Sequence, residues 1–244
     1  PNTKTYPIFR SRRDAEITRS IYANVPVLMR DLQENDQGHN PWGIRFLAMF
    51  HMSNDSHLFK TKDQLEGYSL DGNRFVRGAD SYMPLYEAKM VQIYNHRHGD
   101  FGSVANGERA HVLPTVPVDR LSDPSYLPSP YYWVPQDEVD EVLNEKSWSA
   151  DWLIGWRDVT DARASARTLI ASVIPRAGVN DKFLLMLPQA KPRLACALLG
   201  NLCSLVCDYV ARQKVGGLAL KYFTMKQFPV LSPEMYSEAD IEFI

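Results

Sequence analysis

Apolar residues recur at helical spacing in two parts of the chain. In the first, between Asp14 and Val25, Ala15, Ile17, Ile21 and Tyr22 follow a helical pattern, and Pro26 ends it. In the second, between Arg193 and Gln213, a broad apolar face precedes two glycines, Gly216 and Gly217, which are common just after helices. The spacing predicts one helix over 14–25 and one long helix over 193–213.

Strand-like runs lie between these two helices. Short β-branched or aromatic runs separated by turn-forming residues predict a strand meander, and they occupy Trp152–Arg157, Thr168–Ile174 and Lys182–Leu187. An acidic helix is expected over Gln136–Glu145. Residues 84–94 satisfy neither period, so helix and strand both stay open there. Residues 101–135 are rich in proline, glycine and serine, which predicts a long surface excursion.

Together these elements predict an α+β fold. We expect a mostly antiparallel sheet with packing helices, preceded by a smaller, partly helical segment. The expected division is an N-terminal linker and helical segment over residues 1–70 and a larger domain over 71–244. Thr61 followed by Gln64 is typical of a capping box that opens a short helix in the first part.

Composition is ordinary for a soluble globular protein, with 45% hydrophobic and 23% charged residues among 244. There is no run of eighteen apolar residues and no signal-like start, so we expect a cytoplasmic protein without a membrane partner. Cys196, Cys203 and Cys207 are seven and four residues apart, which predicts one helix face of small core residues and favours this over a zinc site.

The net charge of −2 conceals a division along the chain. Residues 119–151 contain eight acids and two bases, whereas residues 157–226 contain eleven bases and four acids. If the basic stretch folds with its cations on one face, it can neutralise several phosphates. A solvated basic surface without a ligand is the alternative.

Several sequence blocks carry a family resemblance. The C-terminal block comprises the segment LLGNLCSLVCDYVARQ (Leu198–Gln213), the turn around Gly216-Gly217, and Lys226-Gln227-Phe228-Pro229. It resembles the closing element of target-recognition domains in type I specificity subunits and in type IIG or gamma-class adenine-N6 DNA methyltransferases of restriction-modification systems. Gly200-Asn201-Leu202-Cys203-Ser204 departs from the usual Leu-Asn-Ser core of that element.

The second block is Tyr82-Met83-Pro84-Leu85-Tyr86-Glu87-Ala88-Lys89-Met90, followed by Tyr94-Asn95-His96-Arg97. It resembles a block of the same methyltransferases, as do Gly155-Trp156-Arg157-Asp158 and the opening segment around Pro7-Ile8-Phe9-Arg10. The resemblance implies that residues 71–244 are a DNA target-recognition domain whose partner is double-stranded DNA.

The catalytic half of such an enzyme is missing. It needs a glycine-rich loop for S-adenosylmethionine and an Asn-Pro-Pro-Tyr-type motif for the flipped adenine. Asn40-Pro41-Trp42-Gly43 lacks the second proline and is interpreted as a turn. The resemblance therefore implies an excised fragment that has no cofactor and does no catalysis alone, with S-adenosylmethionine bound by a methyltransferase domain on the same parent chain.

The candidate DNA contacts follow from side-chain chemistry. Arg97 and Arg157 suit bidentate binding to guanine, whereas lysines and the remaining arginines suit phosphates. The full predicted set is Lys89, His96, Arg97, His98, Trp156, Arg157, Arg163, Arg167, Arg212, Lys214 and Lys221. We expect the loop around His96 and the basic C-terminal stretch to converge on one surface.

Three alternatives stay open. Glu87-Ala88-Lys89 has the E-x-K form of Mg²⁺-dependent nucleases, which would also require an aspartate such as Asp71 or Asp80. His96 and His98, two residues apart, are compatible with a metal site, although a loop of polar and cationic residues suits DNA contact without an ion. A protein-interaction scaffold is the third alternative.

Overall fold

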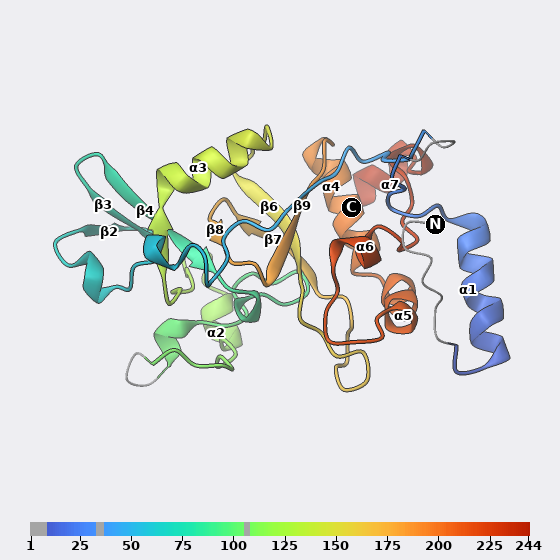
Figure 1. Ribbon diagram of the computed structural model, residues 1–244, viewed down its shortest axis with the longest axis horizontal. Helices are drawn as coiled ribbons and strands as arrows, with labels where there is room; N and C mark the ends of the chain where they lie inside the picture. Colours follow the sequence, from blue (N-terminus) through green and yellow to red (C-terminus); the bar gives the residue numbers. More distant parts are fainter. Residues whose placement is uncertain (1–8, 33–36, 105–107) are drawn as a thin grey trace. The chain divides into compact units, whose positions relative to one another are not determined.

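The computed structural model of the protein describes residues 9–32, 37–104 and 108–244 (Figure 1). The helices are α1 (Arg12–Asn24), α2 (Val118–Leu121), α3 (Gln136–Glu145), α4 (Pro192–Leu202), α5 (Leu205–Lys214), α6 (Tyr222–Met225) and α7 (Glu238–Phe243). The strands are β1 (Arg45–Leu47), β2 (Ser69–Asp71), β3 (Arg74–Arg77), β4 (Asp80–Tyr86), β5 (Trp133–Pro135), β6 (Trp152–Arg157), β7 (Ala171–Pro175), β8 (Gly178–Val179) and β9 (Phe183–Leu187). The two sheets are largely antiparallel and helices pack with them, so the predicted α+β class is confirmed.

The chain divides into two compact units that alternate along the sequence. Unit 1 comprises residues 1–46, 158–171 and 186–244, and unit 2 comprises residues 47–157 and 172–185. The division that we expected between residues 70 and 71 does not coincide with these units, because it lies inside unit 2.

The sheet of unit 2 is built from hairpins. β2, β3, β4 and β5 pair in that order, each pair antiparallel, and β8 pairs with the end of β4 in parallel. Two-residue turns join β2 to β3 and β3 to β4, and each begins with a glycine of positive φ, Gly72 at +59° and Gly78 at +60°. Glycine meets no Cβ penalty in that conformation, which matches the twist of the flanking strands.

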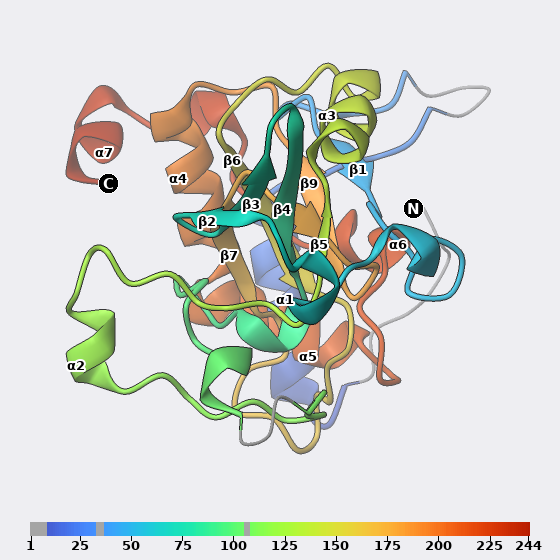
Figure 2. The same ribbon diagram turned by 90° about the vertical axis from the view of Figure 1, so that its left-hand side faces the viewer.

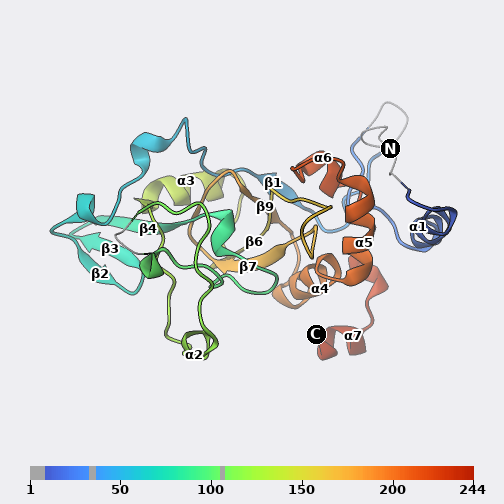
Figure 3. The same cartoon turned by 90° about the horizontal axis from the view of Figure 1, so that it is seen from below.

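Aromatic residues fill the space beside this sheet. Leu65, Phe75 and Trp133 form a buried cluster, in which the Phe75 and Trp133 rings lie edge to face with centroids 5.0 Å apart. The acidic helix α3 has the bounds that we predicted, and its buried residues are Val139 and Leu143. Within the excursion predicted over 101–135, the described residues before β5 project from the sheet and include the short helix α2 (Figures 2 and 3), whereas Trp133–Pro135 belong to β5, so the prediction is wrong at that end.

The second sheet has the strand order β1-β9-β6-β7. β6 has the predicted bounds, and all five residues of β9 are buried. Gly155 of β6 has no room for a side chain, because a Cβ there would lie 2.5 Å from the Phe183 ring. β7 begins three residues later than predicted, since the amides of Thr168 and Leu169 donate to the Asp208 carboxylate.

The helix predicted over 193–213 is instead two helices, α4 and α5, bent by 57°. Ser204 separates them because its hydroxyl caps α5 by accepting from the Cys207 amide at 3.1 Å. The predicted single face of three cysteines is therefore wrong: Cys203 and Cys207 are buried, whereas Cys196 is exposed on α4. No single described helix is long and apolar enough to cross a membrane, and α4 with α5 passes that test only as a bent pair, as buried core helices also do.

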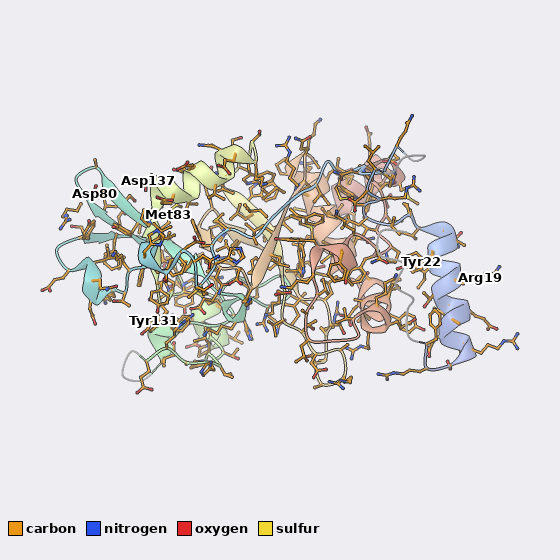
Figure 4. All side chains as sticks on the ribbon, in the orientation of Figure 1. Arg19, Tyr22, Asp80, Met83, Tyr131 and Asp137 are labelled. Carbon is orange, nitrogen blue, oxygen red and sulfur yellow. The ribbon has the colours of Figure 1, made fainter. Side chains whose placement is uncertain are left out.

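Helix α1, predicted over 14–25, is confirmed within two residues. Ser11 caps its first turn, and its inner side bonds to the C-terminal part of unit 1: Tyr22 donates to the Gln227 carbonyl and Thr18 to the Gln213 side chain, both at 2.8 Å. Tyr22 lies on the side of α1 that faces these partners, whereas Arg19 points away (Figure 4).

Candidate nucleic-acid interface

The block Tyr82–Arg97, which carries part of the family resemblance, lies in unit 2. Residues 82–86 belong to β4, residues 88–90 form a 3-10 turn, and the following residues form a closed loop over 91–99. The hydrophobic pattern over 84–94 fits neither helix nor strand because a strand ends at Tyr86 and turns follow it. We call residues 91–99 the 91–99 loop.

A two-residue turn forms the tip of the 91–99 loop. Gln92 and Asn95 exchange both backbone hydrogen bonds, at 2.7 and 2.9 Å, so Ile93 and Tyr94 occupy the central positions. The Asn95 side chain also accepts from the Arg97 amide at 2.9 Å. These bonds give the tip one defined conformation.

Backbone contacts close the base of the loop. The Gly99 amide donates to the Met90 carbonyl at 3.0 Å, and the Val116 amide donates to the His98 carbonyl at 2.9 Å. A Cβ at Gly99 would lie 2.9 Å from the Lys89 carbonyl oxygen and 3.0 Å from the Leu113 Cβ. The loop closes this tightly because glycine stands at position 99.

Two arginines of the predicted site hold the loop in place. Arg97 donates through Nη1 to the carbonyls of Asp123 and Tyr126 and through Nη2 to that of Leu121, at 2.8 to 3.2 Å. Arg157 donates through Nε to the Val91 carbonyl at 2.8 Å. Both guanidinium groups thus donate some of their N–H groups to carbonyls of the protein itself. That their remaining N–H groups bind guanine stays a prediction.

His96 and His98 are the partly buried imidazoles of the same loop. Burial lowers the pKa of His96, and the nearby Arg97 charge lowers it further. Burial also lowers the pKa of His98, with a second contribution from Arg157. Both shifts favour the neutral imidazole, which presents one N–H donor and one acceptor.

The carboxylate of Asp100 organises the start of the projecting segment. Asp100 is buried and accepts from the amides of Gly102 and Ser129, at 2.8 and 2.9 Å, and from the Tyr126 hydroxyl at 2.6 Å. Its charge is paired with Arg120 at 3.7 Å. Asp100, which directly follows the 91–99 loop, thus bonds to both ends of the projecting segment. Arg97 contacts this same segment.

Lys89 belongs to a separate cluster at the foot of the loop. Its ammonium donates to the Ala110 carbonyl at 2.6 Å and lies 3.4 Å from the carboxylate of Glu87, which Arg109 also approaches, at 3.3 Å. Glu87 is buried, and its Oε1 has no hydrogen-bond partner among the described residues.

The nuclease alternative needs an aspartate beside Glu87 and Lys89, and the fold brings neither suggested residue there. Asp80 begins β4 and Glu87 follows its end, so the strand separates them by about 23 Å at its usual rise per residue. Figure 4 shows Asp80 instead beside Asp137 of α3, where both line an acidic pocket. Asp71 lies two strands away from β4. Within the described ranges, no three His, Cys, Asp or Glu side chains gather as metal ligands would.

In unit 1, the predicted contacts Arg167 and Arg212 converge on a buried carboxylate. Asp208 lies 3.6 Å from a nitrogen of each arginine. Arg167 also donates to the Cys203 carbonyl, and Arg212 donates to the carbonyls of Ala162, Ser165 and Ala166. These cations hold the segment 158–171 against α5, so much of the basic charge serves the fold of unit 1.

The remaining predicted residues differ in their contacts and in their exposure. Lys221 pairs with Asp158 at 2.5 Å, and Lys214 donates to Gln227 and lies over the Tyr22 ring. The Arg163 side chain is 83% exposed. Trp156 is fully buried in β6, where its indole belongs to the core of the sheet. The prediction that it contacts DNA from the surface is therefore wrong.

The predicted residues thus form two groups. One group belongs to unit 2, with His96, Arg97, His98 and Arg157 at the 91–99 loop and Lys89 in the cluster at its foot. The other group belongs to unit 1 and comprises Arg163, Arg167, Arg212, Lys214 and Lys221. Their convergence on one DNA-facing surface stays a prediction. Sequence reasoning did not single out Tyr94, whose φ is 56°. Glycine or asparagine at this position would have indicated a positive φ, and tyrosine does not.

In comparisons with known proteins, no protein-family model matches the chain, and no curated protein matches it.

Proposed function

We propose that this chain is the DNA sequence-recognition module of an adenine-N6 DNA methyltransferase of the restriction-modification type. In this proposal it binds duplex DNA and positions it, and a separate domain of the same parent chain binds S-adenosylmethionine and methylates the adenine. The chain itself performs no catalysis.

The observation that supports the proposal is that the sequence block resembling these methyltransferases runs from strand β4 through a 3-10 turn into the 91–99 loop, which holds its residues Tyr94–Arg97. Arg97 and Arg157 hold the 91–99 loop through hydrogen bonds to backbone carbonyls, and the Gly99 amide closes its base on Met90. A loop whose conformation is set before binding loses little entropy when it meets a ligand, which favours selective recognition.

The chemistry of the loop fits base edges. Neutral His96 and His98 each offer a donor and an acceptor, the two groups that base edges in the major groove display. The exposed Arg163 of unit 1 suits a phosphate, which positions DNA without specifying sequence.

The proposal is tested by binding the whole chain to a pool of short duplexes with randomised centres, at about 50 mM and about 200 mM salt. We expect affinity that falls as salt rises and enrichment of a defined sequence. The double variant His96→Ala/His98→Ala should lose the enrichment, whereas Arg12→Ala, which removes an exposed arginine of α1, should retain it.

Two results would contradict the proposal. Absence of salt-dependent DNA affinity would favour the protein-interaction scaffold. Mg²⁺-dependent cleavage of the duplexes that disappears in Glu87→Gln would favour the nuclease.

A further inference from the structure

Tyr94 occupies the tip of the 91–99 loop in a conformation that tyrosine rarely adopts. Its φ of 56° lies in the left-handed region, where Cβ crowds the backbone of every residue except glycine. The same turn would form more easily with glycine or asparagine at this position. The backbone of the turn therefore gives no reason for tyrosine at position 94.

The Tyr94 side chain lies largely outside the core. Tyr94 is 60% exposed, whereas Tyr86 at the end of β4 in the same block is 2% exposed. A large aromatic side chain that is exposed on a strained backbone suggests a role in contact with a ligand.

The residues on either side of Tyr94 hold the tip of the loop in place. Gln92 and Asn95 close the turn on either side of it, Arg157 holds Val91 before it, and Arg97 anchors the chain three residues after it. The ring is thus attached to a loop with bonded ends rather than to a free segment.

We propose that Tyr94 contacts the edge of one base pair and specifies that position of the DNA site; this inference rests on the proposed function. The chemistry suits such a contact, because the hydroxyl can donate to a purine N7 or O6 and the ring can pack on a thymine methyl group. Tyr94 is then a specificity residue beside His96 and His98.

The test compares the sequences that the whole chain enriches from the randomised duplexes when Tyr94 is changed. Tyr94→Asn removes the aromatic ring, and asparagine tolerates positive φ, so the melting temperature should stay or rise by about 2–4 °C. Tyr94→Phe retains the ring and removes only the hydroxyl. Phe243→Asn is the matched control, because it removes another exposed aromatic side chain, which is 93% exposed on α7 of unit 1.

We expect Tyr94→Asn to lose the base preference at one or two adjacent positions while the rest of the enriched sequence persists. Its affinity for the wild-type sequence should fall about tenfold, the size of one base contact. Tyr94→Phe should change the preference at the same positions, and Phe243→Asn should leave it unchanged.

The two proposals fail in different ways. If the wild-type chain enriches a sequence and Tyr94→Asn enriches the same one with affinity within about twofold, the role of Tyr94 is refuted and the proposed function stands. If the wild-type chain enriches no sequence, the proposed function fails and the role of Tyr94 fails with it.

Discussion

Replacement of Asp208 by alanine tests whether the basic C-terminal stretch serves primarily the fold. Asp208 is 5% exposed, and its Oδ1 accepts from the amides of Thr168 and Leu169 at 2.7 and 2.8 Å. The same carboxylate neutralises Arg167 and Arg212, whose side chains are 24% and 28% exposed. The substitution leaves two buried amides without an acceptor and two cations without a counter-charge.

The expected loss follows from these contacts. An orphaned buried donor costs about 1–3 kcal/mol, and breaking a buried ion pair by removing one partner costs about 3–5 kcal/mol. These costs overlap, because the remaining arginines reach some water. We expect Asp208→Ala to lower the free energy of unfolding by about 3–5 kcal/mol. Asp208→Asn retains an acceptor and loses only the charge, so it should cost less.

Urea denaturation of each variant measures the loss, and hydrogen exchange with mass spectrometry locates it. In Asp208→Ala, exchange should accelerate in peptides that contain Thr168 and Leu169. Glu16→Ala is the control, because Glu16 is an exposed carboxylate paired with Arg12 on α1 and should cost no more than about 0.5 kcal/mol. A loss below about 1 kcal/mol with both amides still protected would refute the reasoning that this cluster supports unit 1.

Three further predictions follow from the same kind of contact. Gly155→Ala should destabilise the protein by about 1–3 kcal/mol because its Cβ meets the Phe183 ring, whereas Gly200→Ala, with nothing within 4 Å, should stabilise α4 by about 0.5–1 kcal/mol; equal urea midpoints would contradict this. His96 and His98 have lowered pKa values in the folded state, so the unfolded chain takes up protons first as pH falls below about 6.5, and stability should decrease from about pH 7.5 to about pH 5.5. That decrease should shrink in His96→Gln/His98→Gln, and an unchanged pH slope would assign it to other groups. The exposed Cys196 should react with a thiol reagent in the folded protein, whereas burial raises the pKa of Cys207 to about 12 and protects it, so rapid labelling of Cys207 would contradict the packing of α5.

Much of the secondary structure was predictable because it depends on local pattern. The amphipathic spacing of α1 and α3, the aromatic and β-branched runs of β6 and β9, and the turn at Asn40–Gly43 are features of neighbouring residues. The break between α4 and α5 was missed, although Ser204 is a favourable helix cap, because the apolar pattern continues across it.

The candidate site was less predictable, since side-chain type does not reveal a side chain's partner. Arg97, Arg167 and Arg212 have the composition of a DNA-binding surface, yet each donates to backbone carbonyls that are far away in the sequence. Trp156 has the same difficulty, because an aromatic residue suits both a surface contact and the interior of a sheet.

The sequence by itself determined the α+β class, most element positions and the block from which the 91–99 loop is built, because these depend on periodicity and short-range chemistry. Only the tertiary structure decided which cations are occupied within the protein, that the chain forms two alternating units, and that Tyr94 stands exposed at a strained tip. The physical reason is that hydrogen-bond partners, burial and backbone strain arise from contacts between distant residues, which no local pattern encodes.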